Sequence, residues 1–152
     1  MIRCVDHINI VVSDLERSVR FYTEVLGFRE TRRAHLEGAW IESIVGLKGV
    51  SADVVFVVPE GGEPRFELIQ YHMPQGATVP ETALPNTVGL RHVALRVSDI
   101  ELMVDRIRRS GACVFADPVT VPGSVVKHDA GHKSLCYFRD PDGVILELAQ
   151  YD

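Results

Sequence analysis

The sequence has few cysteines, and they are not arranged for shared chemistry. Cys4, Cys113 and Cys136 are an odd number, lie far apart and include no Cys-x-x-Cys pair. A disulfide framework or a thiolate metal site would need paired, closely spaced cysteines. We therefore expect reduced thiols, mostly buried, that pack as small apolar side chains.

Long apolar runs and clustered basic residues are also absent. The longest purely apolar stretches, such as 54–58, have the length of a strand rather than of a membrane span. The formal net charge is -5, and no long run of Lys and Arg offers the basic footprint that nucleic-acid binding needs. The chain opens without a leader-like apolar segment. The sequence thus predicts a cytoplasmic protein with neither a membrane nor a nucleic-acid partner.

What the sequence does have is an internal duplication. The stretch 6–14, DHINIVVSD, is echoed by 91–99, RHVALRVSD, with its histidine 85 positions later. A second stretch, ELIQY at 67–71, recurs as ELAQY at 147–151, 80 positions later. The similar offsets indicate one duplicated unit with a small insertion or deletion.

The chain length suits a single domain made of two such modules. At 152 residues it lies within the usual range of one domain and can bury a proper core. We place module one at about 1–73 and module two at about 89–152. Between them, the segment of about 74–88 is rich in Pro, Gly and Thr and reads as a linker.

Each module begins with the pattern of a strand followed by a helix. Ser13 and Glu16, like Ser98 and Glu101, have the spacing of a capping box, so we expect both serines to be helix N-caps. Glycines end the two apolar helical stripes, at 27 and 111.

Further strands follow each helix. In module one we expect extended segments at 28–33, 39–45, 54–58 and 65–71, with a turn at 60–62. In module two we expect them at 113–115, near Val125, at 135–139 and at 144–151, after a turn at 140–143. The predicted fold class is α+β, with two tandem βαβββ modules forming curved mixed sheets around a cup.

Two histidines and two glutamates should face the same side of these sheets. After His7 and after His92, apolar residues alternate so that each histidine faces away from the helix-packed core. The residues on either side of Glu67 and of Glu147 are apolar and core-facing, so the glutamates also point away from it. Four such polar side chains on one concave face would be costly unless they shared an ion. Mixed nitrogen and oxygen ligands suit Zn, Ni, Co, Mn or Fe, and the identity of the divalent metal stays open.

Two motifs give the chain a resemblance to a known family. The stretch 12–28, VSDLERSVRFYTEVLGF, and the stretch 139–148, RDPDGVILEL, together with the paired modules, resemble the vicinal oxygen chelate superfamily. That superfamily includes glyoxalase I, methylmalonyl-CoA epimerase, extradiol dioxygenases and bleomycin resistance proteins. In its metal-dependent members the ligands lie on the first and last strands of each module. The resemblance therefore implies the metal ligands His7, Glu67, His92 and Glu147 in this chain.

The resemblance leaves three functions to be weighed. The first is a metal-dependent lyase, isomerase or epimerase, in which a small substrate with vicinal oxygens forms a stabilised enediolate. The second is a ring-cleaving extradiol dioxygenase, which would use iron and only His7, His92 and Glu147. The third is a metal-free antibiotic-binding resistance protein. We favour the first and expect a homodimer, with the substrate itself left open.

In the favoured function, Glu67 and Glu147 would be both metal ligands and the catalytic carboxylates. A carboxylate held tightly by a divalent ion is a poor base, because the ion occupies its lone pairs. One of the two must bind the ion more loosely. Glu147 is needed in every metal-dependent alternative, whereas the dioxygenase scheme can spare Glu67. We therefore assign proton transfer to Glu67 and anchoring of the metal to Glu147.

Overall fold

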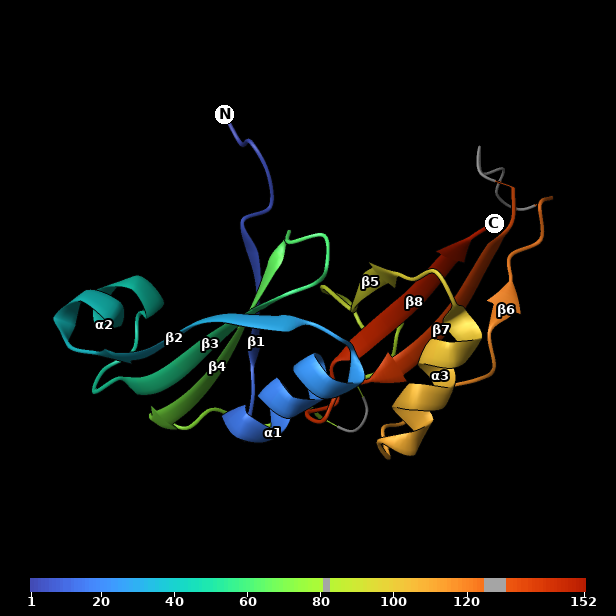
Figure 1. Ribbon diagram of the computed structural model, residues 1–152. Coiled ribbons are helices and arrows are strands. Elements are labelled where there is room, and N and C mark those ends of the chain that lie inside the picture. The colour runs from blue at the N-terminus through green and yellow to red at the C-terminus, as the bar shows by residue number, and fades with distance from the viewer. Residues whose placement is uncertain (81–82, 125–130) are drawn as a thin grey trace. The chain divides into compact units, whose positions relative to one another are not determined.

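The chain forms two units, each built on one mixed β-sheet (Figure 1). A computed structural model describes residues 1–80, 83–124 and 131–152. The first unit is Met1–Thr78 and the second is Val79–Asp152. No helix in the described part of the chain is long and apolar enough to cross a membrane.

The first unit has four strands in the order β1-β4-β3-β2. Strands β1 and β4 are parallel, and the other pairs are antiparallel. Helix α1 continues directly into a single π-helical turn, η1, which Gly27 follows at φ 78°. In chain order the elements are β1 (His7–Val11), α1 (Leu15–Arg20), η1 (Phe21–Val25), β2 (Arg29–Glu37), α2 (Ala39–Val45), β3 (Ser51–Val58) and β4 (Arg65–Met73).

The second unit repeats this arrangement with the order β5-β8-β7-β6. Strands β5 and β8 are parallel, as β1 and β4 are. Its elements are β5 (His92–Arg96), α3 (Ile100–Arg109), β6 (Val119–Thr120), β7 (Lys133–Arg139) and β8 (Ile145–Tyr151). The α+β class and the two βαβββ modules expected from the sequence are thus confirmed.

The core of each unit lies between its sheet and the helix that follows its first strand. In the first unit the aromatic rings of Tyr22, Phe28 and Phe66 pack with centroids 5.2–5.9 Å apart. In the second, Ile107 of α3 is fully buried, as are Phe138 and Leu146 of the sheet. Burial of each such side chain contributes about 1.5–3 kcal/mol.

Helix starts are fixed by aspartates rather than by the predicted serines. Asp14 accepts a hydrogen bond from the Arg17 backbone N–H, and Asp99 accepts one from that of Leu102. The prediction that Ser13 and Ser98 are the N-caps was therefore wrong by one residue. Aspartate caps a helix as well as serine does, and its charge also suits the positive end of the helix dipole.

Strands β4 and β8, which come last along the chain in their units, also fix the first turn of the helix through a hydrogen bond. The side-chain oxygen of Gln70 accepts from the Leu15 N–H at 3.0 Å, and that of Gln150 accepts from the Ile100 N–H at 2.7 Å. Each glutamine lies three residues after the glutamate of its strand, and an odd spacing places it on the opposite, helix-facing side. The glutamine in the repeated ELIQY and ELAQY stretches therefore has a structural role.

The predicted strand at 39–45 is instead helix α2. Gly38 (φ 91°) precedes it, and Gly46 (φ 72°) ends it in the left-handed conformation that glycine adopts without strain. The Glu42 carboxylate accepts from the Gly49 backbone N–H at 2.8 Å and ties the following loop to the helix. Only Ile41 of this helix is buried. A strand packed on a core would bury every second residue instead.

Other local expectations had mixed outcomes. The turns at 60–62 and 140–143 are confirmed by hydrogen bonds from the Gly62 N–H to the Pro59 carbonyl and from the Gly143 N–H to the Asp140 carbonyl. The segment 113–115 contributes only an isolated bridge, Val114 with Phe138. The strand expected near Val125 falls outside the described residues.

The cysteines are free, as expected, but mostly exposed. Only Cys136 is buried, whereas Cys4 and Cys113 are exposed, so the prediction of mostly buried thiols was wrong. Burial raises the pKa of the Cys136 thiol, which is consistent with the packing role that was expected for it.

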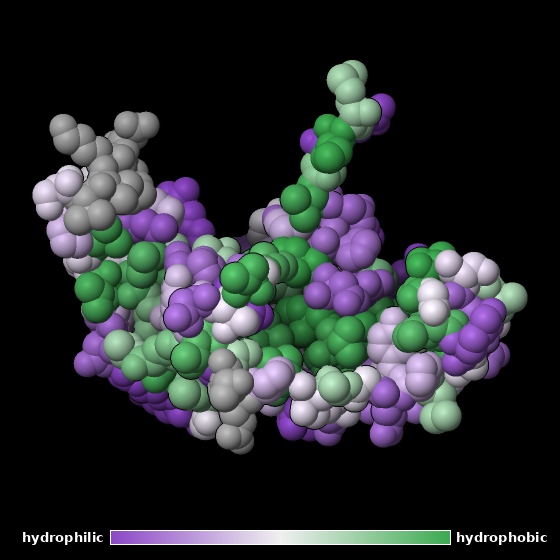
Figure 2. Space-filling model, turned by 180° about the vertical axis from the view of Figure 1, so that it is seen from behind, coloured by the Kyte–Doolittle hydropathy of each residue, from purple (hydrophilic) through white to green (hydrophobic). Residues whose placement is uncertain are grey.

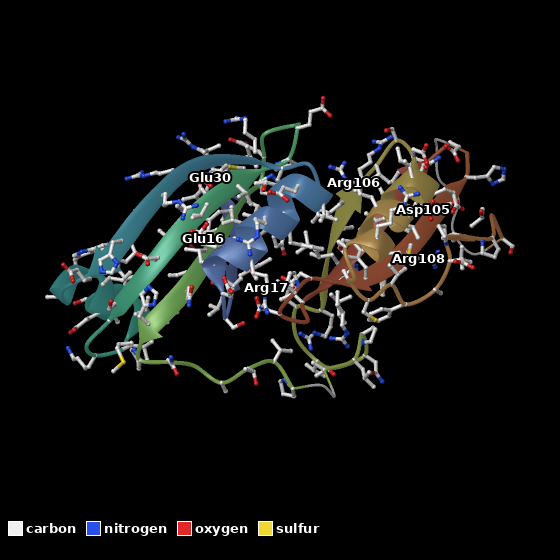
Figure 3. The ribbon with its side chains drawn as sticks, turned by 60° about the horizontal axis from the view of Figure 1, so that its bottom comes forward. Glu16, Arg17, Glu30, Asp105, Arg106 and Arg108 are labelled. Atoms are coloured by element: carbon white, nitrogen blue, oxygen red, sulfur yellow. The ribbon has the colours of Figure 1, made fainter. Side chains whose placement is uncertain are left out.

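Polar contacts connect exposed side chains of the first unit, both within and between its elements. Arg33 of β2 pairs with Glu16 of α1 and Glu30 of β2, and Figure 3 shows these two glutamates from their different elements. On the three neighbouring strands β2, β3 and β4, each carboxylate oxygen of Asp53 contacts one imidazole ring. Asp53 lies 2.7 Å from His35 Nδ1 and 2.8 Å from His72 Nε2.

The Asp53 contacts make stability depend on pH. The hydrogen bond with Asp53 raises the pKa of His35 above its ordinary value of 6.5. The resulting contribution to folding stability is fully present below the pKa that His35 has in the unfolded chain. It is lost as the pH rises through the higher pKa that His35 has in the folded protein. We therefore expect His35→Gln to destabilise the protein at pH 6 and to matter progressively less above that.

Urea unfolding of both proteins from pH 6 to pH 9 measures this difference. The control is the same His35→Gln change in an Asp53→Asn background, where its effect should vary with pH much less, because only the weaker contact with Glu37 remains. An effect of His35→Gln that grew with rising pH would contradict the assignment.

Candidate metal centre

The first unit places His7 beside Glu67. Strands β1 and β4 run in parallel register, with Asn9 opposite Glu67, and His7 lies on the same face two residues earlier. His7 Nε2 is 3.6 Å from Glu67 Oε2. Both side chains are partly accessible, at 40% for His7 and 20% for Glu67.

Asp6 sets the orientation of the His7 ring. His7 Nδ1 is 2.8 Å from Asp6 Oδ2. The hydrogen bond to His7, followed by that from Arg65, lowers the pKa of Asp6, so this carboxylate is ionised and can only accept. His7 Nδ1 therefore donates to Asp6, and in a neutral imidazole Nε2 is the nitrogen left to bind an ion. A carboxylate bonded to the second ring nitrogen is the usual partner of a metal-ligating histidine.

The second unit places His92 beside Glu147 in the same way. Ala94 lies opposite Glu147 in the parallel register of β5 and β8. His92 Nε2 is 3.4 Å from Glu147 Oε2, and the Glu147 side chain is only 6% exposed. The Tyr137 hydroxyl lies 3.4 Å from His92 Nδ1.

The distances in both pairs suit a shared divalent ion. Two donors at about 2.1 Å from an ion, at a tetrahedral angle, are about 3.4 Å apart. The measured 3.6 and 3.4 Å separations are close to this value. Within residues 1–80, 83–124 and 131–152, no three or more His, Cys, Asp and Glu side chains gather as a metal-binding group. Each unit by itself supplies one such pair.

The surroundings of the two glutamates differ. Asn9 Nδ2 donates to Glu67 Oε2 at 2.8 Å, whereas module two has Ala94 at the matching position. Phe56 lies opposite Glu67 in the β3–β4 register, and Tyr137 lies opposite Glu147 in the β7–β8 register. The two modules thus place their polar neighbours on different strands.

Glu147 also faces a cation. Lys133 Nζ lies 3.6 Å from Glu147 Oε1 and 5.3 Å from the centre of the Tyr151 ring. Burial opposes the charged form of Lys133, but hydrogen bonds with Tyr151 and Glu147 outweigh it and raise the lysine pKa. Burial, with the charge of Glu147, raises the pKa of Tyr137. Both neighbours therefore stay in their protonated forms at neutral pH.

A buried apolar cluster adjoins the His7–Glu67 pair. Alternate residues of β3 and β4 that share a face with Glu67 form a cluster around Ala52, Val54 and Ile69. The Phe56 ring, which packs against this cluster, lies edge-on to His7 with centroids 6.1 Å apart. Figure 2 shows hydrophobic side chains gathered below the N-terminal segment.

Sequence reasoning found the four candidate ligands but not all of their neighbours. It did not assign roles to Asp6, Lys133 or Tyr137. Tyr137 could have been found, because the turn at 140–143 pairs Asp140 with Val144 and so sets Tyr137 opposite Glu147. Asp6 is marked only by its position next to His7, and no pattern in the sequence singles out Lys133.

Two relatives match nearly the whole length of this chain. A probable lactoylglutathione lyase of Synechocystis sp. is 28% identical over 146 residues, which is 95% of this chain and 92% of that protein. A 2-epi-5-epi-valiolone epimerase of Actinomyces sp. is 27% identical over 148 residues, which is 95% of this chain and 77% of that protein.

A solved structure is similar in fold as well as in sequence. The crystal structure of a glyoxalase family protein from Bacillus cereus matches with a TM-score of 0.81 and 29% identity, covering 96% of this chain and 92% of that one. The family model described as Glyoxalase/Bleomycin resistance protein/Dioxygenase superfamily matches residues 5–148. With nearly its whole length matched by that model, the chain belongs to the glyoxalase, bleomycin resistance protein and dioxygenase superfamily.

Proposed function

We propose that the protein is a metal-dependent lyase, isomerase or epimerase that stabilises an enediolate next to a substrate carbonyl. The observation that carries the proposal is the repeated pairing of a histidine Nε2 with a glutamate oxygen, at 3.6 Å and 3.4 Å. The sequence relatives whose names denote a lyase and an epimerase support this class of reaction.

In this proposal the two pairs together hold one divalent ion. His7, Glu67, His92 and Glu147 are the ligands, and Zn, Ni, Co or Mn is the metal. Two carboxylates neutralise the charge of a divalent ion, and two neutral imidazoles complete a mixed nitrogen and oxygen set. When bound, the ion would polarise two vicinal oxygens of a small substrate.

Glu67 is the base in this scheme. Its carboxylate removes the proton from the carbon next to the carbonyl, and the electrons of that C–H bond move toward the carbonyl oxygen. Glu67 then returns the proton to the neighbouring carbon, which gives an isomer. An epimer forms where water supplies a proton to the opposite face of the first carbon and Glu67 passes its own proton to solvent. Its neutral partner Asn9 and its partial exposure leave it available to accept a proton.

Glu147 is the anchor. It is more buried than Glu67, and both Lys133 and Tyr137 surround it with protonated groups. Contacts with these two neighbours hold the carboxylate in place, which suits a ligand that stays on the ion. The surroundings of the two glutamates therefore favour different roles for chemically identical groups.

The metal content of the purified protein tests the proposal most directly. We expect elemental analysis of protein purified without added metal or chelator to find close to one Zn, Ni, Co or Mn per chain. His7→Gln should remove it, because the ion loses a nitrogen ligand, whereas His35→Gln, which changes a histidine of the Asp53 cluster, should retain it. Stoichiometric iron would favour a ring-cleaving dioxygenase, and no bound metal would favour a metal-free binding protein.

Substitution of each glutamate separates the base from the anchor. Glu67→Gln should keep most of its metal and lose solvent-deuterium exchange into hydroxyacetone, because an amide cannot accept the proton. Glu147→Gln should lose metal and exchange together. Nuclear magnetic resonance measures the exchange, and elemental analysis measures the metal. If Glu67→Gln exchanged as fast as the unmodified protein, a reaction needing only His7, His92 and Glu147 would be the better interpretation.

We further propose a homodimer, and a mixing experiment shows how its sites are composed. One variant lacks the first pair (His7→Ala, Glu67→Ala), and the other lacks the second (His92→Ala, Glu147→Ala). If each site takes one pair from each chain, the mixed dimer should bind one ion while neither variant alone binds any. If each site lies within one chain, mixing should restore nothing. Sedimentation showing a monomer at micromolar concentration would contradict the dimer.

A further inference from the structure

Asn9 contacts Glu67 although it is not one of the four proposed metal ligands. Asn9 Nδ2 donates to Glu67 Oε2 at 2.8 Å, and this is the same oxygen that lies 3.6 Å from His7 Nε2. Asn9 and Glu67 are direct neighbours in the parallel register of β1 and β4. The amide therefore holds the oxygen that faces the imidazole.

The duplicated module lacks this contact, although it keeps the ligands. Ala94 occupies the matching position opposite Glu147 and has no hydrogen-bonding side chain. The two His–Glu distances are nevertheless nearly the same. In module two Lys133 and Tyr137 contact the glutamate instead, so an amide partner is particular to Glu67.

We propose that Asn9 is a positioning residue for Glu67, an inference that rests on the proposed function. A carboxylate that both binds an ion and accepts a proton needs a fixed orientation for the two roles. A carboxylate oxygen has two lone pairs, so Oε2 can accept the amide N–H and still bind an ion. The amide holds the carboxylate without protonating it, because an amide does not release its proton near neutral pH.

Loss of this contact should affect turnover more than folding. Both side chains lie on an accessible face, so removal of the amide leaves no cavity in the core. The Glu67 carboxylate would instead rotate away from its working orientation. Loss of a group that orients a metal ligand typically costs about 10–100-fold in metal affinity or activity.

The experiment compares Asn9→Ala with Asn9→Gln, which keeps the amide donor on a longer side chain. Each variant is loaded with Co²⁺, and its visible absorption spectrum and bound cobalt are measured. Deuterium exchange into hydroxyacetone gives kcat and KM. Asn86→Ala is the matched control, because Asn86 is the only other asparagine in the sequence and is exposed.

We expect Asn9→Ala to bind one Co²⁺ per chain with an altered spectrum and to lower kcat about 10–100-fold with little change in KM. Asn9→Gln should recover part of the rate, and Asn86→Ala should match the unmodified protein. A purely structural role for Asn9 would change neither the cobalt spectrum nor the balance between kcat and KM.

Failure of this inference and failure of the proposed function give different results. If the unmodified protein catalyses exchange and Asn9→Ala matches it in spectrum and rate, the role of Asn9 is wrong and the proposed function stands. If the unmodified protein binds Co²⁺ but catalyses no exchange, the proposed function is wrong. An altered Asn9→Ala spectrum would then still support positioning, and an unchanged one would overturn it. If the unmodified protein binds no Co²⁺, both are overturned.

Discussion

The parallel pairing of the first and last strands of each unit is the constraint on which the candidate site depends. Neighbouring strands in a sheet lie about 4.8 Å apart, so residues in register are within reach of each other's side chains. This pairing puts Asn9 opposite Glu67 and Ala94 opposite Glu147, and each histidine falls two residues before. On the other face, the same strands present Gln70 and Gln150 to the helix starts. One ladder therefore positions both the helix and the candidate ligands.

Duplication kept this ladder and changed what surrounds it. The His–Glu distances differ by only 0.2 Å, from 3.6 to 3.4 Å. Yet Glu67 has an amide partner from its neighbouring strand, whereas Glu147 is buried beside a lysine and a tyrosine. Equal geometry with unequal electrostatics is a way for a symmetric scaffold to assign unlike tasks to like residues. The proposed division into base and anchor follows from this difference.

Sequence patterns were sufficient for the features that repeat or alternate. The duplication indicated two βαβββ modules, and the two-residue alternation placed each His on the same face as the Glu of its own unit, because both patterns can be read from spacing along the chain. The helix caps were missed by one residue, since serine and aspartate stand side by side in 13–14 and 98–99 and both cap well. Helix α2 was missed because its β-branched and aromatic residues favour a strand, while the flanking Gly38 and Gly46 set its ends.

The neighbours of the candidate ligands were harder to predict, because their contacts depend on how long side chains pack and not on spacing along the chain. Lys133 reaches Glu147 across the β7–β8 hairpin, and its position depends on side-chain packing against Tyr151. Asp6 precedes the first strand and contacts both His7 and Arg65. Such contacts follow from tertiary structure, and the two-residue alternation of a strand does not predict them.

Both histidine-bearing strands lie at the border of their sheets. In the described residues, β1 and β5 are each five residues long and pair on one side only. Short border strands open locally at a lower free energy than central ones, so they exchange their amide hydrogens sooner. An ion bound by a side chain of such a strand and one of its neighbour would stabilise the pairing of the two strands. At an ion concentration of 100 times Kd this linkage is worth about 2.7 kcal/mol, enough to make the opening of the strand depend on ion supply.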